Sequence, residues 1–295
     1  MGGLAMKKIR LSPFNVFNVL LLTFISIMTV YPFWYVIMAS LTSDDRLSQL
    51  IYYLWPVRPT LTAYRMVFST NSILITYRNT IFITVVGTIF SLIITSLTAY
   101  PLSRRRLHGG KLLTGLFYFT MLFSGGLVPT FLVVRGLGLY NTLWALIWPK
   151  VVLVYNLLLM ISFFKSIPDS LEESAALDGA NDVVILIRII FPVSQPIFAT
   201  MTLFYAVNYW NSWFDAVIYI SRTILYPLQL VLRNIVQNVD LSYVGAGAAD
   251  LTMTNLTMQS VRMATIIVAI LPIMLVYPFL QKYFVKGVMI GAIKA

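Results

Sequence analysis

The chain alternates between long apolar runs and short polar segments. Several runs are long enough to cross a bilayer as helices, because a hydrocarbon core of ~30 Å needs about 20 apolar residues. They are Phe14–Met38, Asn79–Ser103, Leu112–Val134, Leu143–Phe164, Ile197–Ile220 and Ala264–Phe284. We therefore predict an all-α membrane protein with six transmembrane helices. Prolines such as Pro101 and Pro272 favour a bundle whose helices satisfy one another's freed backbone groups.

The composition agrees with lipid as the solvent. Of the 295 residues, 59% are hydrophobic and only 11% are charged, whereas a soluble domain has about 25% charged residues. The net charge of +11 is distributed between the apolar runs, so it indicates membrane topology rather than nucleic-acid binding. Cysteine is absent and His108 is the single histidine, which excludes disulfides and thiolate metal sites. We expect no metal site.

The basic residues predict the orientation of the chain. More than half of the 21 lysines and arginines fall in the N-terminal tail, in two internal polar segments and at the C-terminal end. Because positive residues gather on the cytoplasmic side, we predict a cytoplasmic tail over 1–13, a membrane domain over 14–284 and a cytoplasmic tail over 285–295. The first run is too long for a signal-peptide core, so it is expected to be retained. The segments Leu41–Arg78 and Ser221–Met263 would then lie outside and form short helices.

A polar, acid-bearing segment interrupts the apolar pattern at 165–196. Ser170 and Glu173 have capping-box spacing, which predicts a helix start. Gly179 suits the left-handed residue that ends a helix, and Asn181 can cap a second helix over Asp182–Ile190 that Pro192 closes. A short helix with small side chains suits insertion into a cleft on a cytosolic partner. The alternative is a surface loop that merely joins two membrane helices.

This segment resembles a known family. Glu173–Ala180 reads ESAALDGA and is followed by Phe191-Pro192, which is similar to the EAA loop of permease subunits of binding-protein-dependent ABC importers. Ser174 and Phe191 depart from the family pattern with small changes in shape. The C-terminal run Gln281–Lys294 resembles the carbohydrate-importing branch, of the maltose-importer and LplC-like type. The resemblance covers nearly the whole chain.

The resemblance implies the type I ABC importer permease fold with a cytoplasmic coupling helix. It implies a bacterial cytoplasmic (inner) membrane location and an oligosaccharide substrate. The implied partners are two ATPase subunits that bind ATP and magnesium, a second and different permease, and a periplasmic or surface-tethered solute-binding protein. The residues implied to contact the ATPase are Glu172, Glu173, Ala175, Ala176, Asp178, Gly179 and Ala180.

The chain lacks an ATPase motif of its own. Gly109-Gly110-Lys111 has no glycine five residues before Gly110 and is followed by Leu112 instead of Ser or Thr, so it does not match the phosphate-binding loop. We therefore expect a transport subunit that is not itself an enzyme, driven by another polypeptide.

The fifth apolar run is unusually polar. On a continuous helix, Asn208, Asn211, Ser212 and Asp215 would share an arc of about 100°, flanked by Tyr209 and Trp213. Amides and a carboxylate facing lipid are costly, so this face is predicted to line a substrate path. Amides beside aromatic rings suit the hydroxyls and C–H faces of sugars. The alternative is that the rings form an interface belt and the amides join helices.

Tyr155 and Asn156 in the fourth run are further candidates for the path. Arginines near the expected outer helix ends can anchor in the interface or contact an external protein; alternatively they favour an acidic sugar such as a uronate. These arginines are Arg78, Arg135, Arg222, Arg233 and Arg262.

Two other function classes compete with the importer. A secondary transporter or channel would need charges at midplane depth for ion coupling. The sequence offers only Asp215, near the outer edge, and as a second candidate Lys150. A membrane-embedded enzyme would need a histidine cluster, paired carboxylates in the bilayer or a thiol, and the sequence supplies none of these.

Overall fold

The structure is a computed structural model that describes residues 13–42, 54–56, 58–69, 71–237 and 258–292. Residues 1–12 of the predicted N-terminal tail lie outside the described part, as do the side chains of Gln281–Lys294. The chain forms two compact units, Met1–Ser69 with Gly245–Ile267, and Thr70–Val244 with Val268–Ala295.

Helices account for nearly all regular structure in the described residues, which confirms the all-α prediction. The first unit contains α1 (Pro13–Leu41), α2 (Thr62–Ser69) and the start of α14 (Met258–Ala292). The second unit contains α3 (Asn71–Ser103), α4 (Gly110–Leu122), α5 (Leu127–Gly136), α6 (Val154–Lys165), α7 (Ser170–Leu177), α8 (Asp182–Ile185), α9 (Phe191–Val193), α10 (Gln195–Trp210), α11 (Trp213–Tyr219), α12 (Leu228–Val236) and the rest of α14.

Two of the described helices, α1 and α3, are each long and apolar enough to cross a membrane. Three bent pairs qualify only if each pair counts as one span. The pairs are α4 with α5, bent by 114°; Leu143–Lys150 with α6, bent by 47°; and Asp182–Val193 with α10, bent by 87°. The count of six transmembrane helices therefore stays a prediction.

The predicted runs Leu112–Val134, Leu143–Phe164 and Ile197–Ile220 are not continuous helices. The first breaks between α4 and α5, where Gly126 has a φ of 90°, a conformation that favours glycine. The second opens with 3₁₀ turns at Leu143–Leu146 and Trp148–Lys150 before α6. The third breaks between α10 and α11. Short helices do form in the segments 41–78 and 221–263, as α2 and α12; the side of the membrane on which they lie stays a prediction.

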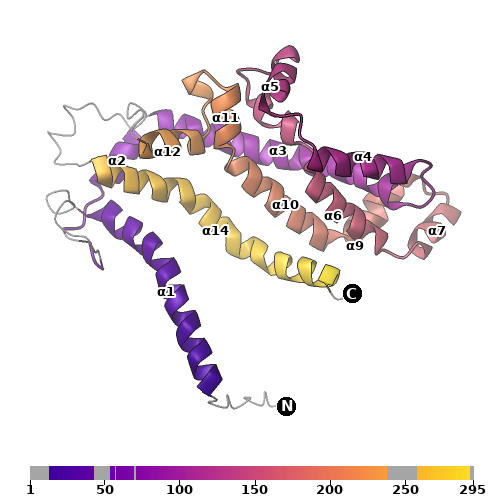
Figure 1. Cartoon of the computed structure of the whole chain (residues 1–295), viewed down its shortest axis with the longest axis horizontal. Helices are drawn as coiled ribbons and strands as arrows, with labels where there is room; N and C mark the ends of the chain where they lie inside the picture. The colour runs from indigo at the N-terminus through magenta and orange to yellow at the C-terminus, as the bar shows by residue number, and fades with distance from the viewer. Residues whose placement is uncertain (1–12, 43–53, 57, 70, 238–257, 293–295) are drawn as a thin grey trace. The chain divides into compact units, whose positions relative to one another are not determined.

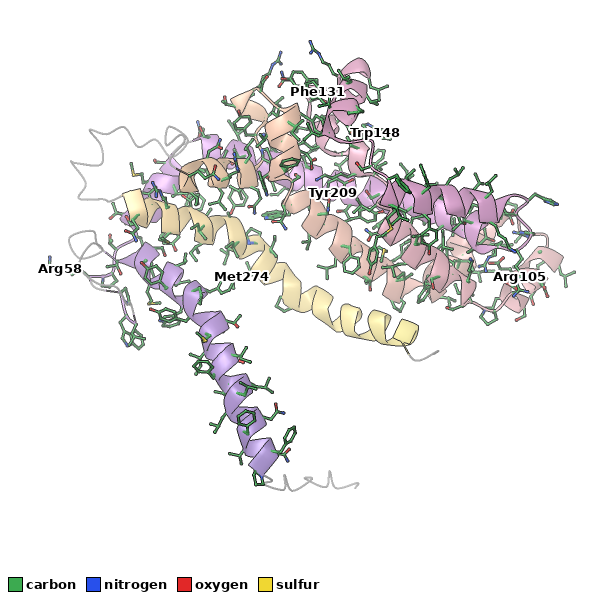
Figure 2. The ribbon with its side chains drawn as sticks, viewed as in Figure 1. Arg58, Arg105, Phe131, Trp148, Tyr209 and Met274 are labelled. Atoms are coloured by element: carbon green, nitrogen blue, oxygen red, sulfur yellow. The ribbon has the colours of Figure 1, made fainter. Side chains whose placement is uncertain are left out.

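The core of the second unit lies where α3 packs against α6 and α10, which run alongside it (Figure 1). Two buried tyrosines of α10 are bound to hydroxyls of α3: Tyr205 to Thr95 at 2.7 Å and Tyr209 to Ser91 at 2.9 Å. The hydroxyl of Tyr209, labelled in Figure 2, also donates to the Ile147 carbonyl at 3.3 Å. The tyrosine hydroxyls thus satisfy polar groups of α3 inside the bundle.

A glycine lets α3 and α10 approach each other at this point. A Cβ on Gly87 would lie 2.8 Å from the Tyr209 ring, closer than carbon atoms can pack. We expect Gly87→Val to destabilise the fold by about 1–3 kcal/mol, because an overpacked core must shift its backbone. The measurement is the midpoint of thermal unfolding in detergent. Gly115→Val in α4 is the matched control, since nothing lies within 4 Å of its added Cβ; equal losses at both positions would contradict the packing argument.

Candidate functional site

The helix α7 ends at a glycine whose backbone is left-handed. Gly179 has a φ of 82°, its N–H donates to the Ala176 carbonyl at 3.0 Å, and the Ala180 N–H donates to the Ala175 carbonyl at 3.0 Å. This pair of bonds is the Schellman arrangement, in which a left-handed residue reverses the chain. The prediction for Gly179 is confirmed.

The predicted capping box at the start of α7 is wrong. Ser170 is the first helical residue rather than the cap, and the preceding Asp169 makes no side-chain capping bond. The N–H groups of Glu172 and Glu173 both donate to the Asp169 carbonyl at 3.0 Å. Backbone bonding therefore starts the helix at Asp169, one residue earlier than the hydroxyl spacing predicted.

The second helix of the segment begins as predicted but ends later. The Asn181 side chain accepts a bond from the Val184 N–H at 2.9 Å, so Asn181 is a helix cap. Pro192 does not close the helix, because a π-helical stretch at Leu186–Ile190 precedes it and α9 continues to Val193. Pro192 follows the π-helical stretch and lacks the N–H that an interior helical residue would donate. The sharp bend into α10 follows at Ser194.

The residues expected to contact an ATPase divide between two faces of the segment. Glu173, Ala176, Asp178 and Gly179 are exposed, whereas Ala180 is half-buried. Glu172 and Ala175 are buried against other residues of the chain and offer little surface to a partner. They turn inward because α7 packs on its own protein along one side. The sequence reading overlooked Leu177, which is 90% exposed on the outward side.

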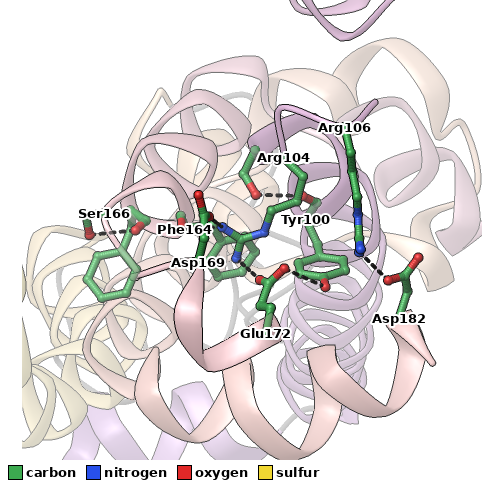
Figure 3. Close-up of polar contacts among 10 residues, drawn as sticks. Tyr100, Arg104, Arg106, Phe164, Ser166, Asp169, Glu172 and Asp182 are labelled. Atoms are coloured by element: carbon green, nitrogen blue, oxygen red, sulfur yellow. Dashed lines mark hydrogen bonds and ion pairs between the residues drawn. The ribbon is translucent and has the colours of Figure 1, made fainter. Parts of the chain in front are cut away.

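Behind α7, the buried Arg104 at the end of α3 joins three segments (Figure 3). Its guanidinium forms an ion pair with Glu172 and lies 3.7 Å from the Asp169 carboxylate. It also donates to the Phe164 carbonyl at 3.2 Å, at the end of α6. The Tyr100 hydroxyl donates to the Glu172 carboxylate at 3.3 Å. The Arg104 guanidinium lies over the Tyr100 ring, 5.2 Å from the centre of that ring.

The pair of charges is deeply desolvated. The side chains of Arg104 and Glu172 are 6% and 9% exposed. Burial raises the pKa of the Glu172 carboxyl, and the Arg104 guanidinium and the Tyr100 hydroxyl counteract that rise. The neighbouring pair Arg106–Asp182 is instead open to solvent, with side chains 57% and 66% exposed. In the sequence, the cluster Arg104-Arg105-Arg106 indicated the cytoplasmic side of the membrane. No neighbouring residue indicated that Arg104 would be the buried one of the three.

The second candidate feature is a cavity of about 730 Å³ between α6, α10, α11 and the turn that ends at Lys150. Its polar lining comes from Lys150, Tyr155, Asn156, Asn208, Asn211, Ser212 and Asp215, and its apolar lining from Leu153, Leu203, Phe204, Val207 and Phe214. Most of the residues predicted for the substrate path thus line one cavity, including the two from the fourth run.

Tyr209 and Trp213 are exceptions and do not line this cavity. Tyr209 is 1% exposed and belongs to the contact between α3 and α10. The Arg233 guanidinium lies over the Trp213 ring, 5.0 Å from the centre of that ring. The predicted common face assumed one continuous helix, and the break at Asn211–Ser212 rotates the residues beyond it. Phe214 also lines the cavity.

No family model matches the sequence. The chain is 44% identical over 283 residues to LplC of Bacillus subtilis (strain 168), covering 95% of each chain. It is 42% identical over 274 residues to the polygalacturonan/rhamnogalacturonan transport system permease protein YtcP of the same organism, covering 91% of this chain and 94% of YtcP. The chain belongs to the permease family of ABC sugar transporters.

A solved structure agrees with this assignment. The ABC sugar permease matches a chain of a bacterial ABC transporter involved in the import of the acidic polysaccharide alginate, with a TM-score of 0.88 and 34% identity. The match covers 92% of this chain and 96% of the other. The resemblance drawn from the EAA-type loop and the C-terminal run, to the LplC-like carbohydrate branch, is thus confirmed. Members of this family are membrane-embedded transport subunits and not enzymes themselves.

Proposed function

We propose that this ABC sugar permease forms half of the translocation path of an ATP-driven importer of oligosaccharides, including chains that contain uronates. The observation that carries the proposal is the construction of α7. Its outward side exposes Glu173, Ala176 and Leu177, while the buried Arg104–Glu172 pair fixes its inward side to α3. A stiff helix held from behind can transmit force from a docked ATPase.

The route from α7 to the cavity is short. Movement of Glu172 is passed to Arg104 at the end of α3. Because α3 is bound to α10 through Tyr205 and Tyr209, a shift of α3 moves α10 as well. The cavity residues Asn208 and Asn211 belong to α10 and its end. ATP-driven closure of the partner thereby changes the shape of the cavity.

The acidic part of the substrate class has two supports. YtcP is named for polygalacturonan and rhamnogalacturonan transport, and the matched structure belongs to an alginate importer. Both names refer to polymers that contain uronic acids. The cavity of this permease also contains a cation, Lys150, which is paired with Asp215.

The complete importer in this proposal contains two ATPase subunits that bind ATP and magnesium, and a second, different permease. A solute-binding protein on the outer side delivers the sugar. The permease contributes six transmembrane helices of the type I fold, with both termini and α7 on the cytoplasmic side of the bacterial inner membrane.

The test is purification of the tagged chain from its own cells, followed by reconstitution into liposomes. We expect an ATPase and a second permease to copurify. We also expect uptake of trigalacturonate to require ATP on the side of the liposome membrane where the ATPase is bound. Uptake driven by a proton or sodium gradient without ATP would support a secondary transporter instead. Copurification of neither protein would contradict the docking role of α7.

A further inference from the structure

An ion pair stands in the wall of the cavity. Lys150 lies at the end of a 3₁₀ turn and Asp215 lies in the first turn of α11, and the two side chains are bound to each other. They are 20% and 22% exposed, so both charges are largely withdrawn from water but still reach the cavity. A charge in such a position needs a partner, because desolvation without one is costly.

The rest of the lining is neutral. Lys150 is the one cation and Asp215 the one carboxylate among the residues that line this cavity. The other polar groups include the amides Asn208 and Asn211 and the hydroxyl of Ser212. Ser212 is 2% exposed, and its Oγ has no hydrogen-bond partner among the described residues. A buried hydroxyl without a partner is a group that a ligand in the cavity can satisfy.

The amides and the hydroxyl suit the uncharged hydroxyls that all sugars share, so they do not separate acidic from neutral chains. The ion pair does separate them. A uronate carries the same chemical group as Asp215, and it can take the place of Asp215 beside Lys150 while the cation remains paired. The displaced Asp215 carboxylate still lines the cavity, where water can solvate it. A neutral sugar cannot make this exchange, because removing Asp215 would leave Lys150 buried and unpaired.

We propose that Lys150 is the residue that selects acidic sugars, and that Asp215 occupies its binding position when no substrate carboxylate is present. The exchange involves no covalent step and leaves the net charge beside Lys150 unchanged. The inference rests on the proposed function, because it assumes that the cavity belongs to the sugar path. It adds which residue reads the charge and what holds that residue in the empty transporter.

The test compares two sugars of the same length, trigalacturonate and its fully methyl-esterified form, in which each carboxylate is a neutral ester. Uptake is measured with the complete importer in liposomes, at one concentration of the same binding protein. The preference of the binding protein then cancels when the acid-to-ester ratio of a variant is divided by that of the wild type.

We expect Lys150→Met to lower the acid-to-ester ratio about tenfold or more, since a charge-paired contact is lost. Lys150→Arg keeps the positive charge and is expected to retain the acid preference. Copurification of the ATPase with each variant checks that the protein still assembles. A ratio unchanged in Lys150→Met, or equal loss of both sugars, would overturn the inference.

A double variant separates attraction by Lys150 from repulsion by the Asp215 carboxylate that Lys150→Met leaves unpaired. Lys150→Met with Asp215→Asn removes both charges, and we expect its acid preference to remain lost. Recovery of that preference would show that repulsion by Asp215 caused the single-variant effect, which would overturn the role of Lys150. If the wild type imports neither sugar, the acidic substrate class of the proposed function fails, a result distinct from equal import of both.

Discussion

Replacing Arg104 with methionine is expected to abolish ATP-driven uptake. The change leaves Glu172 buried without its cationic partner, and breaking a buried pair from one side costs about 3–5 kcal/mol. Because α7 would no longer be held to α3, we expect ATP hydrolysis to continue without sugar uptake. The rates of hydrolysis and of uptake are both measured in liposomes that contain the complete importer. The side chains involved are 6% and 9% exposed, so solvent cannot compensate.

The neighbouring arginine supplies the matched control. Arg106 pairs with Asp182 in solvent, and such exposed pairs contribute only about 0–1 kcal/mol. Arg106→Met should therefore transport at close to the wild-type rate. Wild-type uptake by Arg104→Met, or equal loss in both variants, would contradict the role given to Arg104. Combining Arg104→Met with Glu172→Met removes both charges and should restore assembly of the loop without restoring the polar link to Phe164.

Gly179→Val is expected to uncouple ATP hydrolysis from transport while membrane insertion stays intact. Gly179 has a φ of 82°, a conformation that costs a side-chain-bearing residue about 1–2 kcal/mol, and more for a β-branched one. The substitution would shift the turn that follows α7 and so misplace its exposed side. The measurement is uptake relative to ATP turnover in the reconstituted importer.

Gly109 allows local strain to be separated from loss of docking. It also has a left-handed φ, of 77°, and like Gly179 it has nothing within 4 Å of an added Cβ. It lies in the turn before α4, outside the EAA-type loop. Gly109→Val should carry similar strain yet leave uptake coupled to ATP. Full transport by Gly179→Val would refute the docking role of α7.

Local features of this permease could be predicted from sequence where the deciding residues are neighbours. The turn at Gly179 and the cap at Asn181 depend on backbone preferences of single residues, and both predictions are confirmed. The capping-box prediction failed because the Asp169 backbone carbonyl accepts the hydrogen bonds of the Glu172 and Glu173 N–H groups. The Ser170 hydroxyl therefore does not cap the helix. Spacing alone does not indicate which of two adjacent residues starts a helix.

Contacts between distant segments could not be predicted in this way. The run Arg104-Arg105-Arg106 looks uniform in the sequence, yet only the packing of α3 against α6 and α7 buries Arg104. The pairing of Lys150 with Asp215 likewise depends on the break between α10 and α11. The helix-face argument assigned Asn208 and Asp215 to one path, and the cavity contains both. The same argument placed Tyr209 in the path. Tyr209 instead lies inside the bundle, where its ring packs against Gly87 and its hydroxyl is hydrogen-bonded to Ser91.

The exposure of Leu177 has a consequence for the life of the free subunit. Leu177 is 90% exposed at the end of α7, and under the proposed docking its apolar side chain would be covered only while the ATPase is bound. A permease made in excess of its ATPase would leave that side chain in water. Under the proposed docking, balanced synthesis of the two subunits would keep Leu177 covered in every copy of the permease.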